Sequence, residues 1–487
     1  MENSHNNSDY DVIIIGAGIA GINMAYRLQE RCPDLTYCIV EGRHEIGGTW
    51  SFFKYPGIRS DSDLYTYSFP WRPWKGKSIA PGSQILQYVK DAAAEQGIDA
   101  KIKLNHRVDA VHWSTVAKGW SLDITVQGNT RTTLRSCYLA LASGYYDYEE
   151  PLKTEIPGLN SFNGTVIHPQ FWPRDFDYAN KSLVIIGSGA TAITLLPSLA
   201  KKAGRVTMLQ RSPTYIASMP SESLIQKITK AIFPSFLAYR IIRLQWIFFI
   251  LFVVRFCRTF PRLSRLLLLL RTKAELPSGM PLAPNFTPKY HPFDQNLCVC
   301  PDSDFYQAIK TGKGSIKTGD IDQVTARSIK LKSGEELHPD IIITATGLKL
   351  RFDGGAKFTV DGKGYNLAEH YLWKGVMLED LPNCICISGY FDASWTLGTD
   401  ISAQMACRLF NEKRKNGINI LVPRRSEEER QNMKDMPVTY LNSTYVKAGE
   451  AVLPKAGNGK QWGPRPSYWQ ELLTVRWGDI RTSMECS

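Results

Sequence analysis

The chain contains two segments with the same order of apolar and polar positions: a strand-like run, a glycine-rich turn and a helix-like apolar repeat. The first begins with Val12–Ile15, a run of β-branched residues that is typical of a buried parallel strand. Gly16-x-Gly18-x-x-Gly21 follows directly, and apolar residues continue after it in a helical pattern. This order predicts a strand, a tight turn and a helix in succession.

The glycine turn has the spacing of a dinucleotide-binding site. Its glycines permit a tight turn, close approach of a pyrophosphate and close helix–strand packing, while the start of the helix offers amide groups to the phosphates. A second strand is expected to end at Glu41, whose carboxylate can hold the two hydroxyl groups of a ribose. We therefore predict that this unit binds FAD.

The second segment repeats the pattern with a different charge after its second strand. Leu183–Ile186 forms the predicted strand, and Gly187-x-Gly189-x-x-Ala192 forms the turn. Arg211 stands where the ribose acid would be, and with Ser212 it would bind a 2′-phosphate, which an acid would repel. This unit therefore suits NADPH. A solvated surface charge is the alternative interpretation of Arg211.

Two dinucleotide units in one chain indicate electron transfer between two cofactors. A further buried strand, Ile341–Ala345, is expected to return the chain to the first domain. The predicted fold class is α/β, with two Rossmann-like domains, the FAD domain being split by an inserted NADPH domain. The expected boundaries are 1–150, 151–338 and 339–487, with a helical lobe at about 215–290.

The net charge of +12 comes from one region of the chain. Between Lys201 and Lys273 there are fourteen Lys or Arg residues and a single acid, Glu222. These basic residues lie among long aliphatic runs and match no nucleic-acid motif, so no nucleic-acid partner is expected. The ten cysteines form no CxxC pair, which favours buried thiols in a reducing compartment and no metal site.

Within this basic region, Trp246–Val254 is wholly apolar. The uncharged stretch around it, Leu244–Val254, is about half of the ~20 residues that a membrane-spanning helix needs. Four arginines with 3-4-3 spacing would line one helical face, although Pro261 can bend it: Arg255, Arg258, Arg262 and Arg265.

Two interpretations of this region stay open, and both can hold. It forms a lobe that covers an apolar substrate pocket, or it contacts a membrane peripherally through 240–271. The polar N-terminal stretch shows no signal peptide, so a cytoplasmic location is expected.

Two further stretches carry a family resemblance that extends over nearly the whole chain. "FNGTVIHPQFWP", residues 162–173, matches the FxGxxxHxxxWP pattern of class B flavin monooxygenases in its Baeyer–Villiger form. "GGTWSFFKYPGIRSD" resembles the second fingerprint of the same family through Gly48, Trp50, Tyr55-Pro56-Gly57 and Asp61. Pro169 and Pro173 argue against a continuous helix in the first stretch.

The resemblance implies an FAD- and NADPH-dependent monooxygenase that uses O₂ through a C4a-peroxyflavin. The expected reaction is Baeyer–Villiger oxidation of an apolar ketone or aldehyde in a pocket that excludes water. Oxygenation of nitrogen or sulfur, or hydroxylation, by the same flavin peroxide is the alternative. An NADPH-dependent reductase and a flavin-binding scaffold without turnover are further alternatives.

The resemblance also implies the site residues. Asp61 would lie beside nicotinamide and flavin, and His168 and Trp172 would form a hinge contact that changes as NADP moves. The expected FAD-binding residues are Gly16, Gly18, Ala20, Gly21, Glu41, Gly48, Thr49, Trp50, Asp61 and Val108. The expected NADP-binding residues are Arg59, Ser60, Asp61, Gly187, Ser188, Gly189, Ala190, Thr191, Ala192, Arg211 and Ser212.

At one position the chain departs from the family. Family members carry an arginine that offsets the negative charge of the flavin peroxide, and its place aligns with Asn296 here. Asn296 can donate a hydrogen bond but brings no charge. Lys289 or His291 could replace the missing cation. We therefore count Asp61, His168, Trp172 and Asn296 as the candidate catalytic residues, and the type of oxygenation stays open.

Overall fold

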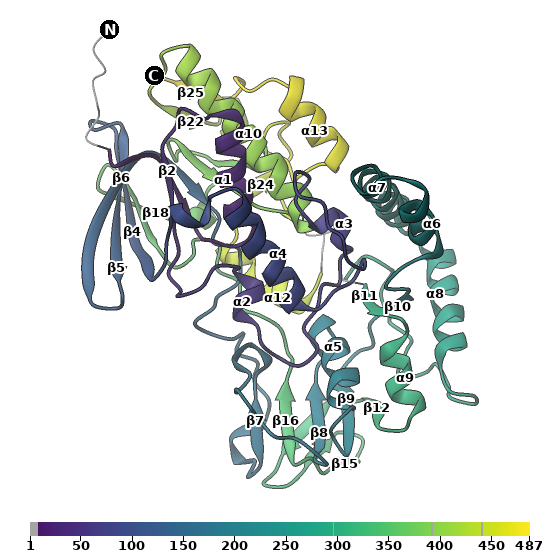
Figure 1. Ribbon diagram of the computed structural model, residues 1–487. Helices are drawn as coiled ribbons and strands as arrows, with labels where there is room; N and C mark the ends of the chain where they lie inside the picture. Colours follow the sequence, from purple (N-terminus) through teal and green to yellow (C-terminus); the bar gives the residue numbers. More distant parts are fainter. Residues whose placement is uncertain (1–7, 296, 391–392, 440–441) are drawn as a thin grey trace.

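The computed structural model describes residues 8–295, 297–390, 393–439 and 442–487, and it contains two separate major sheets (Figure 1). The first sheet has eleven strands and the second has five. Figure 1 shows the first sheet with helices α1, α4 and α10 in the upper part of the view and the second sheet below it. Each sheet holds one of the two glycine-rich turns.

The first sheet has the order β18-β17-β4-β5-β6-β1-β2-β3, and β21 pairs with β6. Around β1 the strands are parallel, as in a nucleotide-binding fold. Its strands are β1 (Tyr10–Ile15), β2 (Tyr37–Val40), β3 (Ile102–Lys103), β4 (His106–Ser114), β5 (Gly119–Val126), β6 (Thr130–Leu141), β17 (Lys357–Val360), β18 (Lys363–Tyr365), β19 (Leu372–Trp373), β20 (Met377–Leu378) and β21 (Cys384–Cys386).

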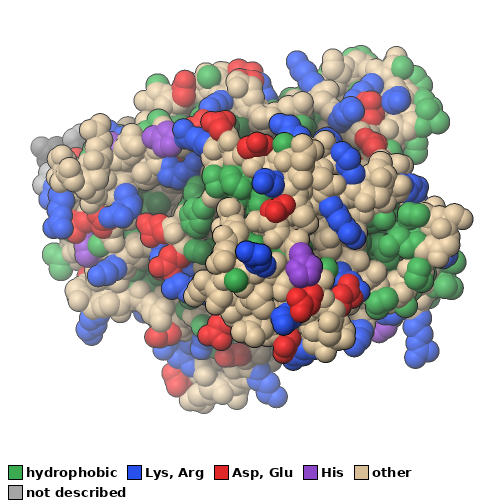
Figure 2. Space-filling view, turned by 90° about the horizontal axis from the view of Figure 1, so that it is seen from below, with side chains coloured by type: hydrophobic (Ala, Val, Ile, Leu, Met, Phe, Trp, Pro, Cys, Tyr) green, Lys and Arg blue, Asp and Glu red, His purple; other side chains and the backbone are tan. Residues whose placement is uncertain are grey.

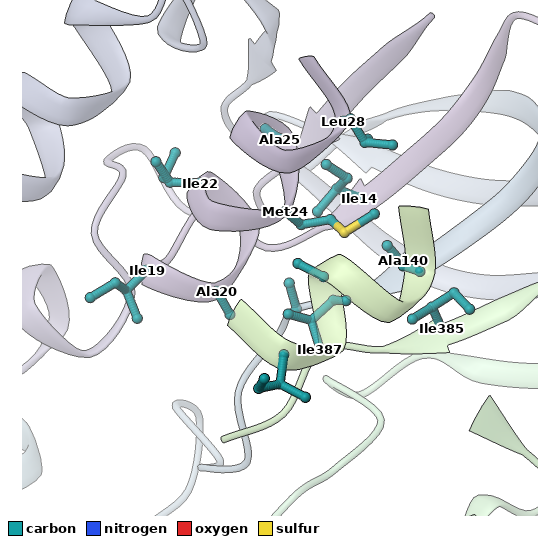
Figure 3. Packing of buried hydrophobic residues seen from close by; sticks show 14 of the residues in the cluster. Ile14, Ile19, Ala20, Ile22, Met24, Ala25, Leu28, Ala140, Ile385 and Ile387 are labelled. Carbon is teal, nitrogen blue, oxygen red and sulfur yellow. The ribbon is translucent and has the colours of Figure 1, made fainter. Parts of the chain in front are cut away.

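Helices α1 (Ile19–Arg31), α4 (Gly82–Glu95) and α10 (Trp395–Lys415) cover one face of this sheet. Figure 3 shows Met24 and Leu28 of α1 beside Ile14 of β1, and all three are fully buried. The β-branched run of β1 is therefore covered by a helix, as its composition predicts.

The second sheet is parallel throughout and has the order β12-β9-β8-β16-β7. Helices α5 (Ala190–Leu199) and α9 (Asp304–Lys310) pack against it. Its strands are β7 (Thr165–Ile167), β8 (Ser182–Ile186), β9 (Arg205–Gln210), β12 (Gly314–Thr318) and β16 (Ile341–Thr344).

The expectation that Ile341–Ala345 returns the chain to the first domain is wrong. Its strand β16 lies between β7 and β8 of the second sheet and pairs in parallel with both. An isoleucine-rich strand buried on both faces fits either sheet, so composition alone does not assign it. The chain rejoins the first sheet only at β17.

Residues 216–301 connect β9 to the rest of the second unit and contain three consecutive helices. These are α6 (Leu224–Ile232), α7 (Ser235–Thr259) and α8 (Pro261–Glu275), flanked by the paired strands β10 (Ile216–Met219) and β11 (Cys298–Pro301). The predicted helical lobe is thus present within this region. Figure 1 shows α6, α7 and α8 together on one side of the molecule.

The single arginine face predicted across this region does not form. Pro261 occupies the first turn of α8, where its missing N–H costs nothing, so a new helix begins there. Arg255 and Arg258 therefore belong to α7, whereas Arg262 and Arg265 belong to α8.

The remaining elements are short. Two short helices, α2 (Thr49–Phe52) and α3 (Leu64–Tyr67), follow β2. Three strands form a small antiparallel sheet: β13 (Ile321–Val324), β14 (Ile329–Leu331) and β15 (Glu336–Leu337). The C-terminal segment contains β22 (Leu421–Pro423), α11 (Glu427–Asn432), β23 (Asp435–Met436), α12 (Thr444–Gly449), β24 (Ala456–Gly457), α13 (Tyr468–Trp477) and β25 (Met484–Cys486).

The chain crosses between the two sheets twice, and the two crossing segments pair with each other. Tyr146 and Leu350 form an antiparallel bridge. Asp147, which is 1% exposed, directs its carboxylate at Lys349 Nζ (3.0 Å) and Arg351 Nε (3.2 Å). Burial by itself would raise the pKa of Asp147, but two backbone amides and the two cations outweigh it and hold this pKa below its usual range.

We expect Asp147→Asn to destabilise the protein by about 1–3 kcal/mol at neutral pH, because two cations lose their shared buried partner. The folded-state pKa lies below the unfolded value of about 4, so this contribution is complete above that value and fades as pH falls through the folded pKa. Thermal unfolding at neutral pH and near pH 3 measures the difference in stability between wild type and variant. This difference should be smaller near pH 3 than at neutral pH.

Asp109→Asn is the matched control, since Asp109 pairs with Arg107 at the surface. Exposed pairs contribute little, so this variant should lose less than about 0.5 kcal/mol. An equal loss of stability in both variants would show that the buried ion pairs of the crossing segments stabilise the protein no more than an exposed pair does.

Candidate active site

The first glycine turn joins β1 to α1 and admits no side chain at two of its positions. Gly16 has φ +106°, and a Cβ there would lie 2.6 Å from the carbonyl oxygen of Ala142. A Cβ on Gly21 would lie 1.9 Å from the carbonyl oxygen of Gly16. Gly18 precedes α1 and provides no side-chain cap, so the first amides of the helix face outward for an anion.

The second fingerprint lies against this turn. Gly48 has φ +55°, and a Cβ on it would come within 3.1 Å of Gly18 Cα. Thr49 Oγ1 lies 3.2 Å from Tyr148 Oη, and Trp50 Nε1 donates a hydrogen bond to Tyr67 Oη at 2.8 Å. The structure thus brings these candidate FAD residues together in a cradle that larger side chains would fill.

Glu41 stands at the end of β2 and is tied to the same turn. Its Oε2 accepts a hydrogen bond from the amide of Ala17 at 2.9 Å, and its Oε1 accepts one from the amide of Arg43 at 3.0 Å. Each oxygen keeps a second lone pair for a ribose hydroxyl. Ala20 and Val108 are buried in the core, so they can contribute only backbone groups to a cofactor.

The second glycine turn joins β8 to α5 and is open on its outer side. Gly187 has φ +136°, and its Cβ would lie 2.2 Å from the carbonyl oxygen of Ala345, whereas a Cβ on Gly189 would meet nothing within 4 Å. Ala190 is exposed at the start of α5, Thr191 is half-buried, and Ala192 is fully buried against the sheet. This turn can receive a phosphate group.

Two further predicted residues lie at the end of β9. Arg211 and Ser212 are both exposed there, and Ser188 Oγ of the glycine turn donates to the carbonyl oxygen of Ser212 at 3.0 Å. Arg211 therefore lies beside the second glycine turn. This is the position in which a 2′-phosphate would be bound.

Asp61 lies between the two units. Asp61 is exposed, and desolvation by the protein groups around its carboxyl raises the pKa of that group. Tyr55 and Tyr67 have raised pKa values, mainly through burial and partly through the negative charge of Asp61. Tyr67 accepts a hydrogen bond from Trp50 of the first unit, whereas Tyr55 lies near Thr191 of the second.

Two tyrosines from the first crossing segment complete these surroundings. Tyr145 and Tyr146 are hydrogen-bonded to each other at 2.9 Å. Burial raises both pKa values, and the charge of Asp61 adds to the shift. No signal in the sequence marks these aromatic residues, because a tyrosine pair in a connecting segment carries no motif. Their position becomes informative only once the topology is known.

Arg59 and Ser60, both expected at the NADP site, have different surroundings. Arg59 forms an ion pair with Asp304 at the start of α9, so it links the fingerprint loop to the second unit. Ser60 is buried, and its hydroxyl donates to the carbonyl oxygen of Ser62. Gly57 packs on α5, since its Cβ would lie 2.8 Å from Ser198 Cβ.

The signature stretch of residues 162–173 contains the edge strand β7 and a short 3₁₀ turn, Pro169–Phe171. It is not a continuous helix, as its prolines predict. Gly164 is required by packing, since its Cβ would lie 2.5 Å from the carbonyl oxygen of Asp340. Gln170 Nε2 donates to the carbonyl oxygen of Asp147 at 2.7 Å, which joins the stretch to the first crossing segment.

His168 and Trp172 of this stretch lie close to the crossing segments and the second core. His168 Nδ1 accepts a hydrogen bond from the amide of Gln170 at 3.3 Å, and its buried Nε2 has no hydrogen-bond partner among the described residues. Burial lowers the pKa of His168. Trp172 makes edge contacts with Phe176 and Tyr178.

Asn296 lies outside the described residues. The two cations considered as its substitutes, Lys289 and His291, are both exposed.

The start of α10 supplies two more polar groups near Tyr145. Ser394 Oγ and Thr396 Oγ1 are buried without a hydrogen-bond partner in the described part of the chain. Trp395 between them lies against Tyr145, with ring centroids 4.7 Å apart. Such orphaned groups beside the aromatic residues near Asp61 fit a bound cofactor that carries its own donors and acceptors. The residues present therefore fit FAD at the first unit.

A small cavity and a larger groove lie away from the two glycine turns. A cavity of about 70 Å³ is lined by Tyr145, Trp395, Tyr390 and Arg465, and by Arg258 from the end of α7. A larger open groove of about 770 Å³ lies over the C-terminal segment and is lined by other residues, among them Arg424 and Arg481. The smaller cavity borders the aromatic site, and the larger one does not.

Comparison with known proteins agrees with this geometry. Residues 13–238 match the family described as pyridine nucleotide-disulphide oxidoreductase. The FAD-containing monooxygenase EthA of Mycolicibacterium smegmatis is 41% identical over 473 residues, which cover 97% of this chain and 95% of the relative. EthA of Mycobacterium tuberculosis is 42% identical over 472 residues, or 96% of each chain. Probable FAD-binding monooxygenase AlmA of an Acinetobacter species is 41% identical over 474 residues, covering 96% of this chain and 95% of the relative.

Solved structures share the fold at low sequence identity. OTEMO in complex with FAD and NADP has a TM-score of 0.75 and 17% identity, covering 99% of this chain and all of that one. Oxidized steroid monooxygenase bound to NADP has a TM-score of 0.74 and 18% identity, covering 98% and 99%.

Two glycine turns on two sheets define a flavoprotein oxidoreductase with two dinucleotide-binding units. By its identity to the EthA proteins over nearly their whole length, the chain belongs to the family of FAD-containing monooxygenases. The resemblance to class B flavin monooxygenases and the predicted α/β fold class are confirmed. The predicted cofactors, FAD and NADPH, agree with this family.

We expect Arg211→Ala to weaken the use of NADPH by about 1.5–3 kcal/mol, because a charged hydrogen bond to the 2′-phosphate is lost. The use of NADH should hardly change. Steady-state kcat/KM for both nucleotides measures the effect. Arg205→Ala is the control, since Arg205 is exposed at the opposite end of β9. Equal losses for NADPH and NADH would assign Arg211 a structural role instead.

Proposed function

We propose that this chain is an NADPH- and O₂-dependent flavin monooxygenase that converts an apolar ketone or aldehyde to an ester by Baeyer–Villiger oxidation. Oxygenation of nitrogen or sulfur, or hydroxylation, is the alternative reaction of the same site. The observation that carries the proposal is the position of Asp61. One neighbouring tyrosine, Tyr67, is hydrogen-bonded within the first glycine-turn unit, and the other, Tyr55, lies near Thr191 of the second.

FAD, when bound, accepts hydride from NADPH and activates O₂. The glycine cradle of Gly18 and Gly48 would hold its phosphates, and Glu41 its ribose. Arg211 and Ser212 would hold the 2′-phosphate of NADPH. These assignments rest on the backbone contacts and exposure of the residues themselves.

Asp61 would act where the two cofactors meet. Its carboxyl has a raised pKa and is surrounded by phenol groups, which supports a role in orienting the nicotinamide amide through hydrogen bonds. The aromatic side chains around it would exclude water from the reaction. His168, whose buried Nε2 has no hydrogen-bond partner among the described residues, would exchange contacts with the crossing segments as the nucleotide moves.

The contacts of the cysteines do not favour a disulfide reductase. Cys298 lies near Asp61, and Cys300 follows two residues later on β11. Burial raises the pKa of both thiols to about 12, so neither supplies the thiolate that disulfide exchange requires.

For its location we propose the cytoplasm, with peripheral contact to a membrane within residues 240–271. The support is the composition of α7. This 25-residue helix has a window with mean hydropathy 1.8, which makes it long and apolar enough to cross a membrane by these two criteria alone. An apolar substrate could then reach the enzyme from a membrane.

Product analysis under ¹⁸O₂ tests the reaction type. The purified enzyme, supplied with NADPH and a panel of ketones, amines and sulfides, should place one ¹⁸O atom in each product. Ester formation would support the Baeyer–Villiger assignment, whereas sulfoxides or N-oxides alone would replace it with heteroatom oxygenation. NADPH consumption without any labelled product would contradict a monooxygenase.

Asn296→Arg should raise the ratio of ester to sulfoxide about tenfold, because a cation would offset negative charge at the site of oxygen transfer. The rate of flavin reduction by NADPH should change much less, since hydride transfer does not use that charge. An unchanged ratio beside efficient ester formation by the wild type would mean that another cation acts there.

A further inference from the structure

Helix α6 exposes its apolar residues and buries its two uncharged polar ones. Leu224, Ile225 and Ile232 are 63–72% exposed. Gln226 and Thr229 are buried, and Gln226 Nε2 donates a hydrogen bond to Ser78 Oγ at 2.7 Å. A surface helix of a protein in water has the opposite arrangement.

Helix α7 also exposes large aromatic side chains, and it buries one charged side chain beside its apolar ones. Phe236, Phe248 and Phe252 are 59–66% exposed, whereas Arg243 is only 7% exposed. The Arg243 guanidinium lies inward and donates to the carbonyl oxygens of three residues in and after α3: Tyr65, Thr66 and Ser68. The charged residue is therefore used to fix the helix, and the aromatic residues face outward.

Helix α8 has the same inversion. Its exposed leucines are Leu263, Leu266, Leu267 and Leu270, and its buried residues include Ser264 and Thr272. Among the described residues, fifteen of the twenty-one strongly exposed large apolar side chains lie between 224 and 270. We call the exposed side of α6, α7 and α8 the docking face. Figure 2 shows hydrophobic side chains gathered on the side of the molecule that carries these helices.

The charge of this region identifies what can cover the docking face. Residues 223–274 contain ten Lys or Arg and no Asp or Glu. Lys227, Arg240, Arg255, Arg262 and Arg271 are exposed. A second copy of the chain would oppose cations to cations across a two-fold axis, which is unfavourable. Anionic lipid headgroups above an acyl layer match both the charge and the apolar residues.

The contacts of α7 determine how it can meet a bilayer. Tyr239 Oη donates to the carbonyl oxygen of Phe69 at 3.0 Å, and the bonds of Arg243 hold the next turn. A helix fixed along one side cannot leave the protein to span a membrane. Although α7 is long enough to cross, it would lie in the plane of the membrane surface with its free side toward the lipid.

We propose that the docking face binds the surface of an anionic lipid bilayer, with α6, α7 and α8 lying parallel to the membrane. This membrane-binding proposal rests on the proposed function in one respect, because it identifies the monooxygenase substrate as a molecule dissolved in the bilayer. Arg258, at the membrane-facing helix α7, lines the cavity that Tyr145 and Trp395 also line. A substrate that leaves the lipid beside α7 therefore has a short path to the aromatic site.

Vesicle sedimentation of the full-length holoenzyme tests the docking face. Wild type should bind vesicles of phosphatidylcholine with phosphatidylglycerol at low salt, bind them more weakly at high salt, and bind pure phosphatidylcholine poorly. The double variant Ile225→Ser/Phe252→Ser should lower the partition coefficient about tenfold, because two exposed apolar side chains are lost. Lys227→Glu/Arg240→Glu should lower binding to anionic vesicles by a similar factor.

Two exposed residues outside the docking face serve as controls. Val116→Ser changes a residue that is 95% exposed between β4 and β5, and Lys332→Glu reverses an exposed charge in the second unit. Neither should alter vesicle binding. Equal binding of all variants, or no binding by wild type, would overturn the proposal. Wild-type dimers that Ile225→Ser/Phe252→Ser dissociates, without vesicle binding, would assign the face to self-association instead.

Turnover separates this proposal from the proposed function. With a water-soluble substrate, the docking variants should keep wild-type NADPH-dependent turnover. With a long-chain ketone dissolved in anionic vesicles, their turnover should fall in parallel with binding. Vesicle binding without turnover of any substrate would leave the docking face intact and contradict the monooxygenase. Equal turnover of the vesicle-bound ketone by all variants would contradict delivery from the bilayer.

Discussion

The relative position of the two sheets depends on one buried carboxylate. Asp147 holds the outgoing and returning segments side by side through Lys349 and Arg351, and its carbonyl oxygen receives Gln170 of the signature stretch. The segment that carries Asp147 also carries Tyr145 and Tyr146, which are near Asp61. This electrostatic contact between the two crossing segments, together with the Arg59–Asp304 ion pair, holds the two units in the arrangement in which two cofactors would meet.

Local sequence predicts the two glycine turns well, and the reason is steric. A Cβ on Gly16 or Gly187 would overlap a carbonyl oxygen just after a neighbouring strand, and a Cβ on Gly21 would overlap that of Gly16 in its own turn. These constraints fix the spacing of the glycines in the sequence. The sheet to which β16 belongs was not predictable, because a fully buried strand has the same composition in either sheet. The aromatic surroundings of Asp61 also come from separate segments, and only the fold brings them together.

The apolar basic region shows a different limit of sequence reasoning. Its composition indicated lipid contact or a pocket cover, but the expected arginine face combined two helices that Pro261 separates. Burial, not spacing, shows which residues matter: Arg243 and Gln226 are inside, while leucines and phenylalanines are outside. Arg258 borders the cavity from the same helix. The lobe and membrane interpretations are thus compatible, since one side of α7 faces the protein and the other faces outward.

The proposed function depends on hydride transfer from NADPH to FAD at the site of Asp61. Anaerobic mixing of the FAD-loaded protein with NADPH, followed by flavin absorbance, measures this step without any oxygenation substrate. We expect full bleaching of the flavin, slower with NADPH deuterated at the transferred position, and much slower in Asp61→Ala with FAD still bound. Bleaching at the same rate in Asp61→Ala, or no bleaching by NADPH in wild type, would contradict it.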